Sequence, residues 1–175
     1  RCPTPFMKAY EIFQNLDETL AHEIIGYFRT ESRDIYKATV SSLATQRKLR
    51  AAYVQKKPGA DQIAWVVKTL KLKMADTVGE HLLQVWLLKQ RKDMLIRFVD
   101  DLGIEHDDDG GVENLPETIE EDKLKAAIDH LLEDYPANVV TLYLRVFQIQ
   151  QPGGWPAIAG ALETDKRLEL GRVGG

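Results

Sequence analysis

The residues with the strongest chemical potential in this sequence are charged, and they are unevenly distributed. Between positions 47 and 73 the only acidic residue is Asp61, whereas Lys and Arg recur throughout. Such a basic segment can bind phosphate groups, and the interleaved rings of Tyr53 and Trp65 could stack on bases. The densest part of the segment supplies the candidate polyanion-binding residues, which are Arg47, Lys48, Arg50, Lys56 and Lys57. The sequence therefore predicts weak, nonspecific nucleic-acid binding as one function of residues 47–73.

Two other interpretations of the basic segment stay open. The same charges are complementary to the acidic half of another copy, or of the chain itself. Lysines on helix surfaces are also commonly just solvated. Tyr53 belongs to a stretch that could be a last helical turn or a short extended piece, and Trp65 sits beside the apolar face of the next predicted helix, so both rings suit the core better than a binding surface. We therefore expect both rings to lie in the core, and this expectation argues against nucleic-acid binding.

The opposite charge is concentrated in residues 105–116, which read EHDDDGGVENLP. Carboxylates on a flexible loop are the ligands that Ca²⁺ and Mg²⁺ prefer, so the candidate metal ligands are Asp107, Asp108 and Asp109. The loop departs from the EF-hand pattern, because setting Gly110 at the invariant glycine puts Pro116 where a bidentate Glu is needed. A solvated acidic linker is the favoured interpretation, with weak cation binding as the alternative.

Other catalytic patterns do not occur in the sequence. His22 and Glu23 begin like a zinc-protease helix, but Gly26 stands where the second histidine is needed. Cys2 is the only cysteine, so no thiolate-rich zinc site can form, and no glycine-rich loop of the kind that binds nucleotides occurs. We expect no cofactor, and a metal-dependent enzyme is the third functional hypothesis.

The elements that must position these residues are all predicted to be helices. Residues 74–103 carry the richest apolar pattern, with Val78, Leu82, Val85 and Trp86 at steps of three and four. Leu83, Leu87 and Leu88 widen this stripe, so the helix should be buried on most sides. Gly103, followed by the apolar Ile104, predicts a left-handed helix ending of the Schellman type. Apolar residues recur with the same period through most of the remaining chain.

The predicted fold is therefore all-α, an irregular array of antiparallel helical hairpins in two packed lobes. We expect a helix from Leu16 to about Arg29 capped by Asn15, a second after the break at residues 30–33, and a hairpin of helices on either side of Pro136. No period near 34 or 40 residues repeats, so the array is HEAT-like without regular repeats. The expected domains are residues 1–104 and 117–175, joined by the linker 105–116.

Composition narrows the functional classes further. The formal charge of -4 is too small to imply a partner, and no apolar run approaches the roughly 18 residues of a membrane helix. A single cysteine and the lack of a signal-peptide pattern favour the cytoplasm. The leading hypothesis is a non-enzymatic interaction or scaffolding module that binds another protein, with no membrane partner.

Overall fold

The computed structural model describes residues 6–151 and 155–171, and every regular element among them is a helix. The all-α prediction is confirmed, whereas a HEAT-like arrangement and two packed lobes stay predictions. Cys2 lies outside the described residues. No helix of the described chain is both long and apolar enough to span a bilayer.

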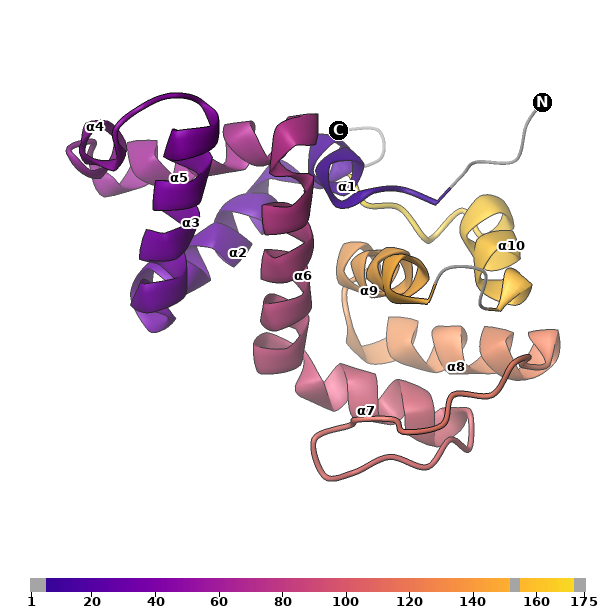
Figure 1. The fold of residues 1–175 in the computed structure, drawn as a ribbon. Helices are drawn as coiled ribbons and strands as arrows, with labels where there is room; N and C mark the ends of the chain where they lie inside the picture. Colours follow the sequence, from indigo (N-terminus) through magenta and orange to yellow (C-terminus); the bar gives the residue numbers. More distant parts are fainter. Residues whose placement is uncertain (1–5, 152–154, 172–175) are drawn as a thin grey trace. The chain divides into compact units, whose positions relative to one another are not determined.

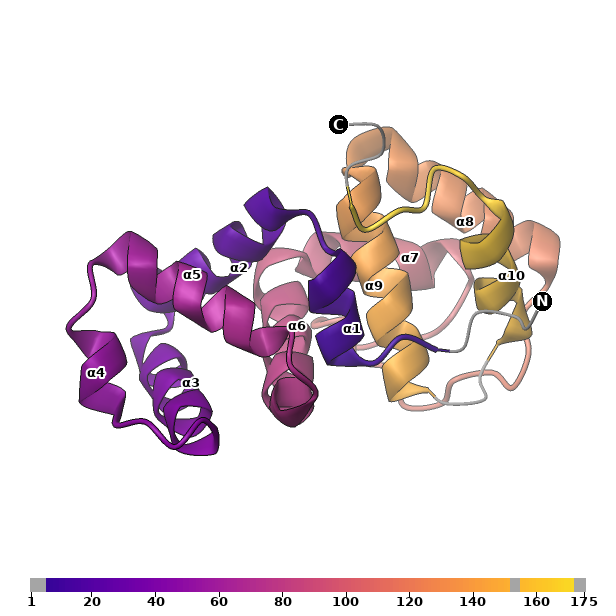
Figure 2. The same ribbon diagram turned by 90° about the horizontal axis from the view of Figure 1, so that it is seen from above.

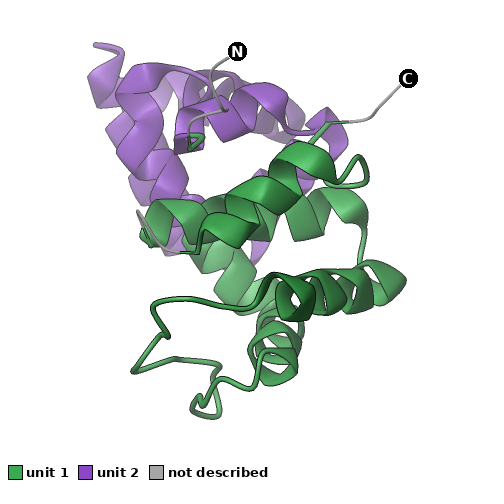
Figure 3. Cartoon of the chain, turned by 90° about the vertical axis from the view of Figure 1, so that its right-hand side faces the viewer, with its two compact units in different colours: residues 1–7, 84–175 green, residues 8–83 purple. Residues whose placement is uncertain are grey.

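The helices group into two compact units, residues 8–83 and residues 1–7 with 84–175 (Figure 3), and the second is called the unit of residues 84–175 below. The boundary between them falls inside α6 (Asp76–Gln90), and residues 105–116 connect two helices of the second unit. The units are defined by internal contacts and not by independent folding, so the domains expected from the sequence stay a prediction.

The unit of residues 8–83 is built around the pair α2 and α3, against which the next helices pack (Figure 1). Its elements are α1 (Ala9–Asn15), α2 (Glu18–Glu31), α3 (Arg33–Gln46), α4 (Ala51–Gln55), α5 (Gly59–Leu70) and a 3₁₀ turn (Lys73–Ala75). The predicted hairpin of α2 and α3 is confirmed, since the two helices contact each other. Phe28, Leu43 and Leu70, one from each of α2, α3 and α5, are at most 1% exposed and lie in the apolar core of this unit.

The start of α2 differs from the sequence prediction. Asp17, and not Asn15, precedes the helix, and its Oδ2 accepts a hydrogen bond from the backbone N–H of Leu20 at 3.2 Å. Asn15 instead ends α1 and donates its side-chain amide to the carbonyl of Glu11. An aspartate cap satisfies one otherwise unpaired N–H as well as an asparagine does, so the spacing of caps alone could not separate the two positions.

The unit of residues 84–175 contains α7 (Lys92–Asp101), α8 (Glu121–Asp134), α9 (Ala137–Gln150) and α10 (Pro156–Thr164). Helix α10 contacts both α8 and α9, and α7 contacts α8 (Figure 2). The predicted hairpin around Pro136 is confirmed. Gly103 has φ of +69°, and the N–H of Ile104 donates to the carbonyl of Val99 at 2.9 Å, which confirms the Schellman ending of α7.

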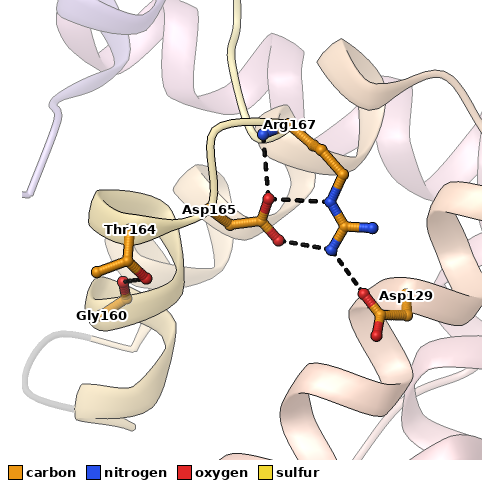
Figure 4. A network of polar contacts seen from close by, with 5 residues as sticks. All are labelled: Asp129, Gly160, Thr164, Asp165 and Arg167. Atoms are coloured by element: carbon orange, nitrogen blue, oxygen red, sulfur yellow. Dashed lines mark hydrogen bonds and ion pairs between the residues drawn. The ribbon is translucent and has the colours of Figure 1, made fainter.

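Ion pairing fixes the segment that follows α10. The guanidinium of Arg167 binds both carboxylate oxygens of Asp165 and also reaches Oδ1 of Asp129 on α8 at 2.6 Å (Figure 4). The hydrogen bonds from Arg167 lower the pKa of Asp165 below its ordinary value. Leu168 and Leu170 are each 4% exposed, so apolar burial accompanies the ion pair.

The central stretch, residues 74–103, is buried largely as predicted. Trp86 is 2% exposed, and Leu82, Leu83 and Leu87 are also buried. Leu88 is 53% exposed, so the prediction of burial was wrong at this position. Residue 88 follows Leu87 by one step of 100°, which turns it off the buried stripe.

Phe98 provides the test of this core. Its ring is fully buried and meets the rings of Tyr143 and Phe147 edge-on, with centroids 5.2 and 6.4 Å away. We expect Phe98→Ala to lower the free energy of unfolding by about 3–5 kcal/mol, measured by urea denaturation. The control Leu88→Ala should change it by less than about 0.5 kcal/mol. Equal midpoints for the two variants would contradict this packing.

Candidate interaction surface

The densest part of the basic segment surrounds α4, a helix of only five residues. Val54 is fully buried and anchors the helix, whereas Tyr53 is 56% exposed. The expectation that Tyr53 lies in the core was therefore wrong. Successive residues of a helix differ by 100° in direction, so burial of Val54 turns the preceding ring toward solvent. Trp65, the other ring of the segment, is partly exposed.

A hollow of about 470 Å³ opens beside this helix. We call its lining the α4 face, which consists of Arg50, Ala52, Tyr53, Lys56 and Lys57. The Nζ of Lys57 lies 4.8 Å from the centroid of the Tyr53 ring, a cation–π contact that holds one side of the ring. Apolar surface in the middle and cations around it thus share one small concavity.

Three of the five candidate polyanion-binding residues meet in this hollow, namely Arg50, Lys56 and Lys57. The other two lie in the turn before α4. Arg47 donates to Oγ1 of Thr69 on α5 at 3.5 Å, and Lys48 links α3 to α4. In the described part of the chain, none of the five takes part in an ion pair; the Lys and Arg ion pairs found there involve other cations, which are Lys71, Lys92, Arg97 and Arg167.

Side chains from two other helices fix the turn after α4. The amide nitrogen of Gln62 donates to the carbonyls of Gln55 at 3.0 Å and Lys57 at 2.9 Å. The hydroxyl of Tyr36 on α3 donates in turn to Oε1 of Gln62 at 3.0 Å. Burial raises the pKa of Tyr36 above its ordinary value. The sequence carried no signal for these two positioning residues, because neither belongs to a recognisable motif.

The backbone of the turn before α4 is strained at one residue, Lys48. Lys48 has φ of +59°, and the N–H of Leu49 donates to the carbonyl of Ala44 at 2.8 Å, so α3 ends in a Schellman turn with lysine at the left-handed position. Glycine usually occupies this position, because a Cβ there costs roughly 1–2 kcal/mol. A cation is therefore present where glycine would be less strained.

The acidic loop is organised by its own backbone. Oδ1 of Asp107 accepts the N–H groups of Asp109 and Gly111, both at 2.8 Å, and these bonds lower the pKa of Asp107. Asp109 pairs with Nζ of Lys92 at 2.6 Å, which raises the pKa of that lysine, while Asp108 is exposed. Within the described ranges, no group of three or more His, Cys, Asp or Glu residues is placed to hold a metal ion. The metal assignment of residues 107–109 stays a prediction.

Two further contacts hold the rest of this loop. Both ring nitrogens of His106 face acceptors, Oδ1 of Asp100 at 2.5 Å and the carbonyl of Asp107 at 2.6 Å, so the ring donates both bonds only when it is protonated. These bonds raise the pKa of His106, the backbone one most. Farther along, Nε1 of the buried Trp155 donates to the carbonyl of Pro116 at 2.8 Å. The loop lines a cavity of about 790 Å³, to which Ile104, Val112 and Glu113 contribute.

Comparison with known protein families, with characterised proteins and with solved structures finds no match for this chain.

The left-handed lysine gives a direct prediction. Lys48→Gly should raise the free energy of unfolding by about 0.5–1 kcal/mol, because relief of the Cβ strain exceeds the added entropy of the unfolded chain. The same replacement inside α3, Lys37→Gly, should lower it by about 1 kcal/mol. Chemical denaturation of both variants measures the difference. A loss of stability in Lys48→Gly would contradict a left-handed residue 48.

The acidic loop gives a second prediction. Asp107→Asn should speed hydrogen exchange at the amides of Asp109 and Gly111, because the neutral amide is a weaker acceptor. Since the folded pKa of Asp107 is lowered, the protection should be complete above its ordinary value of 3.8 and disappear as the pH falls through the folded value. Nuclear magnetic resonance measures both effects. The control Asp108→Asn should leave exchange unchanged, and equal effects of the two substitutions would contradict the assignment.

Proposed function

We propose that this chain is a non-enzymatic helical interaction module that binds another protein through the α4 face. The observation that supports the proposal most directly is an exposed ring in one hollow with three cations that form no ion pair within the described ranges. Tyrosine and arginine are enriched where protein interfaces derive most of their binding energy.

The chemistry of the α4 face defines the kind of partner. Ala52, the ring of Tyr53 and the methylene stems of the lysines suit an apolar side chain, and a hollow of about 470 Å³ has room for one large one. Arg50, Lys56 and Lys57 suit carboxylates on either side of it, since charge-assisted hydrogen bonds are about twice as strong as neutral ones. The proposed ligand is an acidic polypeptide segment with an apolar anchor.

The framework under the α4 face supports binding without a large entropic cost. Val54 is buried, and Gln62 ties the carbonyls at the end of α4 to α5. Surfaces that are rigid before binding lose less conformational freedom when a partner arrives. Lys48 adds to this argument, because strained residues cluster at functional positions more often than elsewhere.

Nucleic acid is the second candidate for the same cations. The basic segment suits a phosphate backbone, yet Tyr53 is the only aromatic side chain classed as exposed within residues 8–83, all of which are described. Single-stranded nucleic acids usually bind through several stacking rings along a groove. One ring beside one hollow favours a single anchoring side chain, so a protein partner ranks first.

The test compares two defined ligands. One is a short fluorescein-labelled peptide of Glu and Gly with one central Trp, and the other is a mixed-sequence oligonucleotide. Fluorescence anisotropy should show peptide binding that weakens roughly tenfold in Tyr53→Ala and in the double variant Arg50→Gln/Lys56→Gln. The control is Arg33→Gln/Lys37→Gln, which removes the same charge from exposed positions of α3 and should bind as the parent does.

Two outcomes would change the assignment. The oligonucleotide should bind no tighter than about 100 µM near 0.15 M salt, the weak end of nonspecific affinity. Tighter binding that falls linearly with salt on logarithmic axes, and is lost in the double variant, would put nucleic acid first. Peptide binding that is unaffected by Tyr53→Ala would rule out the α4 face as the site.

A further inference from the structure

The acidic part of the same chain has the properties that the α4 face requires of a partner. We call residues 105–122 the acidic segment; it carries nine carboxylates and neither Lys nor Arg. Residues 105–120 contain no helix or strand, so outside the turn at residues 107–111 their backbone is not committed to regular hydrogen bonding. Val112, Leu115 and Ile119 are partly exposed and alternate with the carboxylates, which places apolar anchors between negative charges.

Some carboxylates of the acidic segment already form contacts within the unit, and others are exposed to solvent. Asp107 binds backbone N–H groups and Asp109 pairs with Lys92. Asp108, Glu113 and Glu117 are exposed, and no ion pair involves them in the described part of the chain. The free carboxylates and the free cations of the α4 face are therefore complementary in sign and also in their pattern around apolar groups.

We infer that the α4 face binds the acidic segment of a second copy of this chain. The inference rests on the proposed function and names its partner. Charge complementarity carries it, because among the described residues Arg50, Lys56 and Lys57 form no ion pair on one surface, and Asp108, Glu113 and Glu117 form none on the other. The contact is heterologous, since two different surfaces meet, so each added copy leaves one surface of each kind free and the association is open-ended unless a ring closes.

Two neutralised variants test the inference together. One carries Arg50→Gln and Lys56→Gln, and the other carries Asp108→Asn, Glu113→Gln and Glu117→Gln. Each lacks one of the two surfaces, so each alone should remain monomeric in analytical ultracentrifugation. Mixed in equal amounts they should form a dimer and nothing larger, because the mixture contains one intact surface of each kind. The parent chain should associate further as concentration rises.

The salt dependence and matched control variants distinguish this contact from nonspecific association. Association of the parent should weaken at least about tenfold between 0.05 and 0.3 M salt, as exposed ion pairs are screened. Arg33→Gln/Lys37→Gln, and a triple variant with Glu133, Glu163 and Glu169 changed to Gln, remove the same charges from other exposed positions. Both controls should associate as the parent does.

Each contrary result has a definite meaning. A parent chain that stays monomeric at low salt, or a mixture that stays monomeric, overturns the inference; so does association that survives neutralisation. If the chain is monomeric while the acidic Trp peptide still binds and Tyr53→Ala still weakens it, the proposed function stands and only the second copy is excluded. If the peptide does not bind either, the proposed function fails as well.

Discussion

The burial of Val54 decides how the basic segment meets solvent. Helix α4 has five residues and too few internal hydrogen bonds to be stable alone, so its orientation depends on the one side chain that enters the core. With Val54 inside, Tyr53 must point outward, and the cations at either end of the helix fall around it. The placement of the exposed ring and of the cations around it thus follows from an apolar contact in the core.

Some charged side chains of the described residues form ion pairs between segments of the chain, and others do not. Arg167 bridges Asp129 and Asp165, and Lys92 pairs with Asp109, so these side chains join segments that are distant in sequence. Exposed pairs of this kind contribute little stability each, typically below about 1 kcal/mol. Among the described residues, the cations of the α4 face form none of these ion pairs, and Lys57 instead contacts the ring of Tyr53.

The sequence predicted the helices well, and it predicted the surface poorly. Apolar spacing near 3.6 residues is set by burial and can be read directly, and the glycine at position 103 has the backbone freedom that its turn needs. Lys48 occupies an equivalent turn at the end of α3, but lysine gives no sign of a left-handed backbone. The direction of Tyr53 depends on whether residues 49–54 form a helix or an extended piece, and a segment so short has too few residues to show either period. Contacts such as Tyr36 to Gln62 join positions 26 residues apart and depend on the tertiary fold.

The two charged regions also differ in how much order they have before any partner arrives, and this difference bears on binding. The turn after α4 is held in place, because the side-chain amide of Gln62 donates to the carbonyls of Gln55 and Lys57. The acidic segment has no regular structure before Glu121, yet Asp107, His106 and Trp155 hold it at separate points along its length. When an irregular segment binds a partner, each residue that becomes ordered loses conformational entropy. Contacts that already order part of the segment in the folded unit reduce this loss on binding. Those anchors use Asp107 and Asp109, whereas Asp108, Glu113 and Glu117 form no ion pair within the described residues, so the contacts that order the loop leave these three carboxylates exposed to solvent.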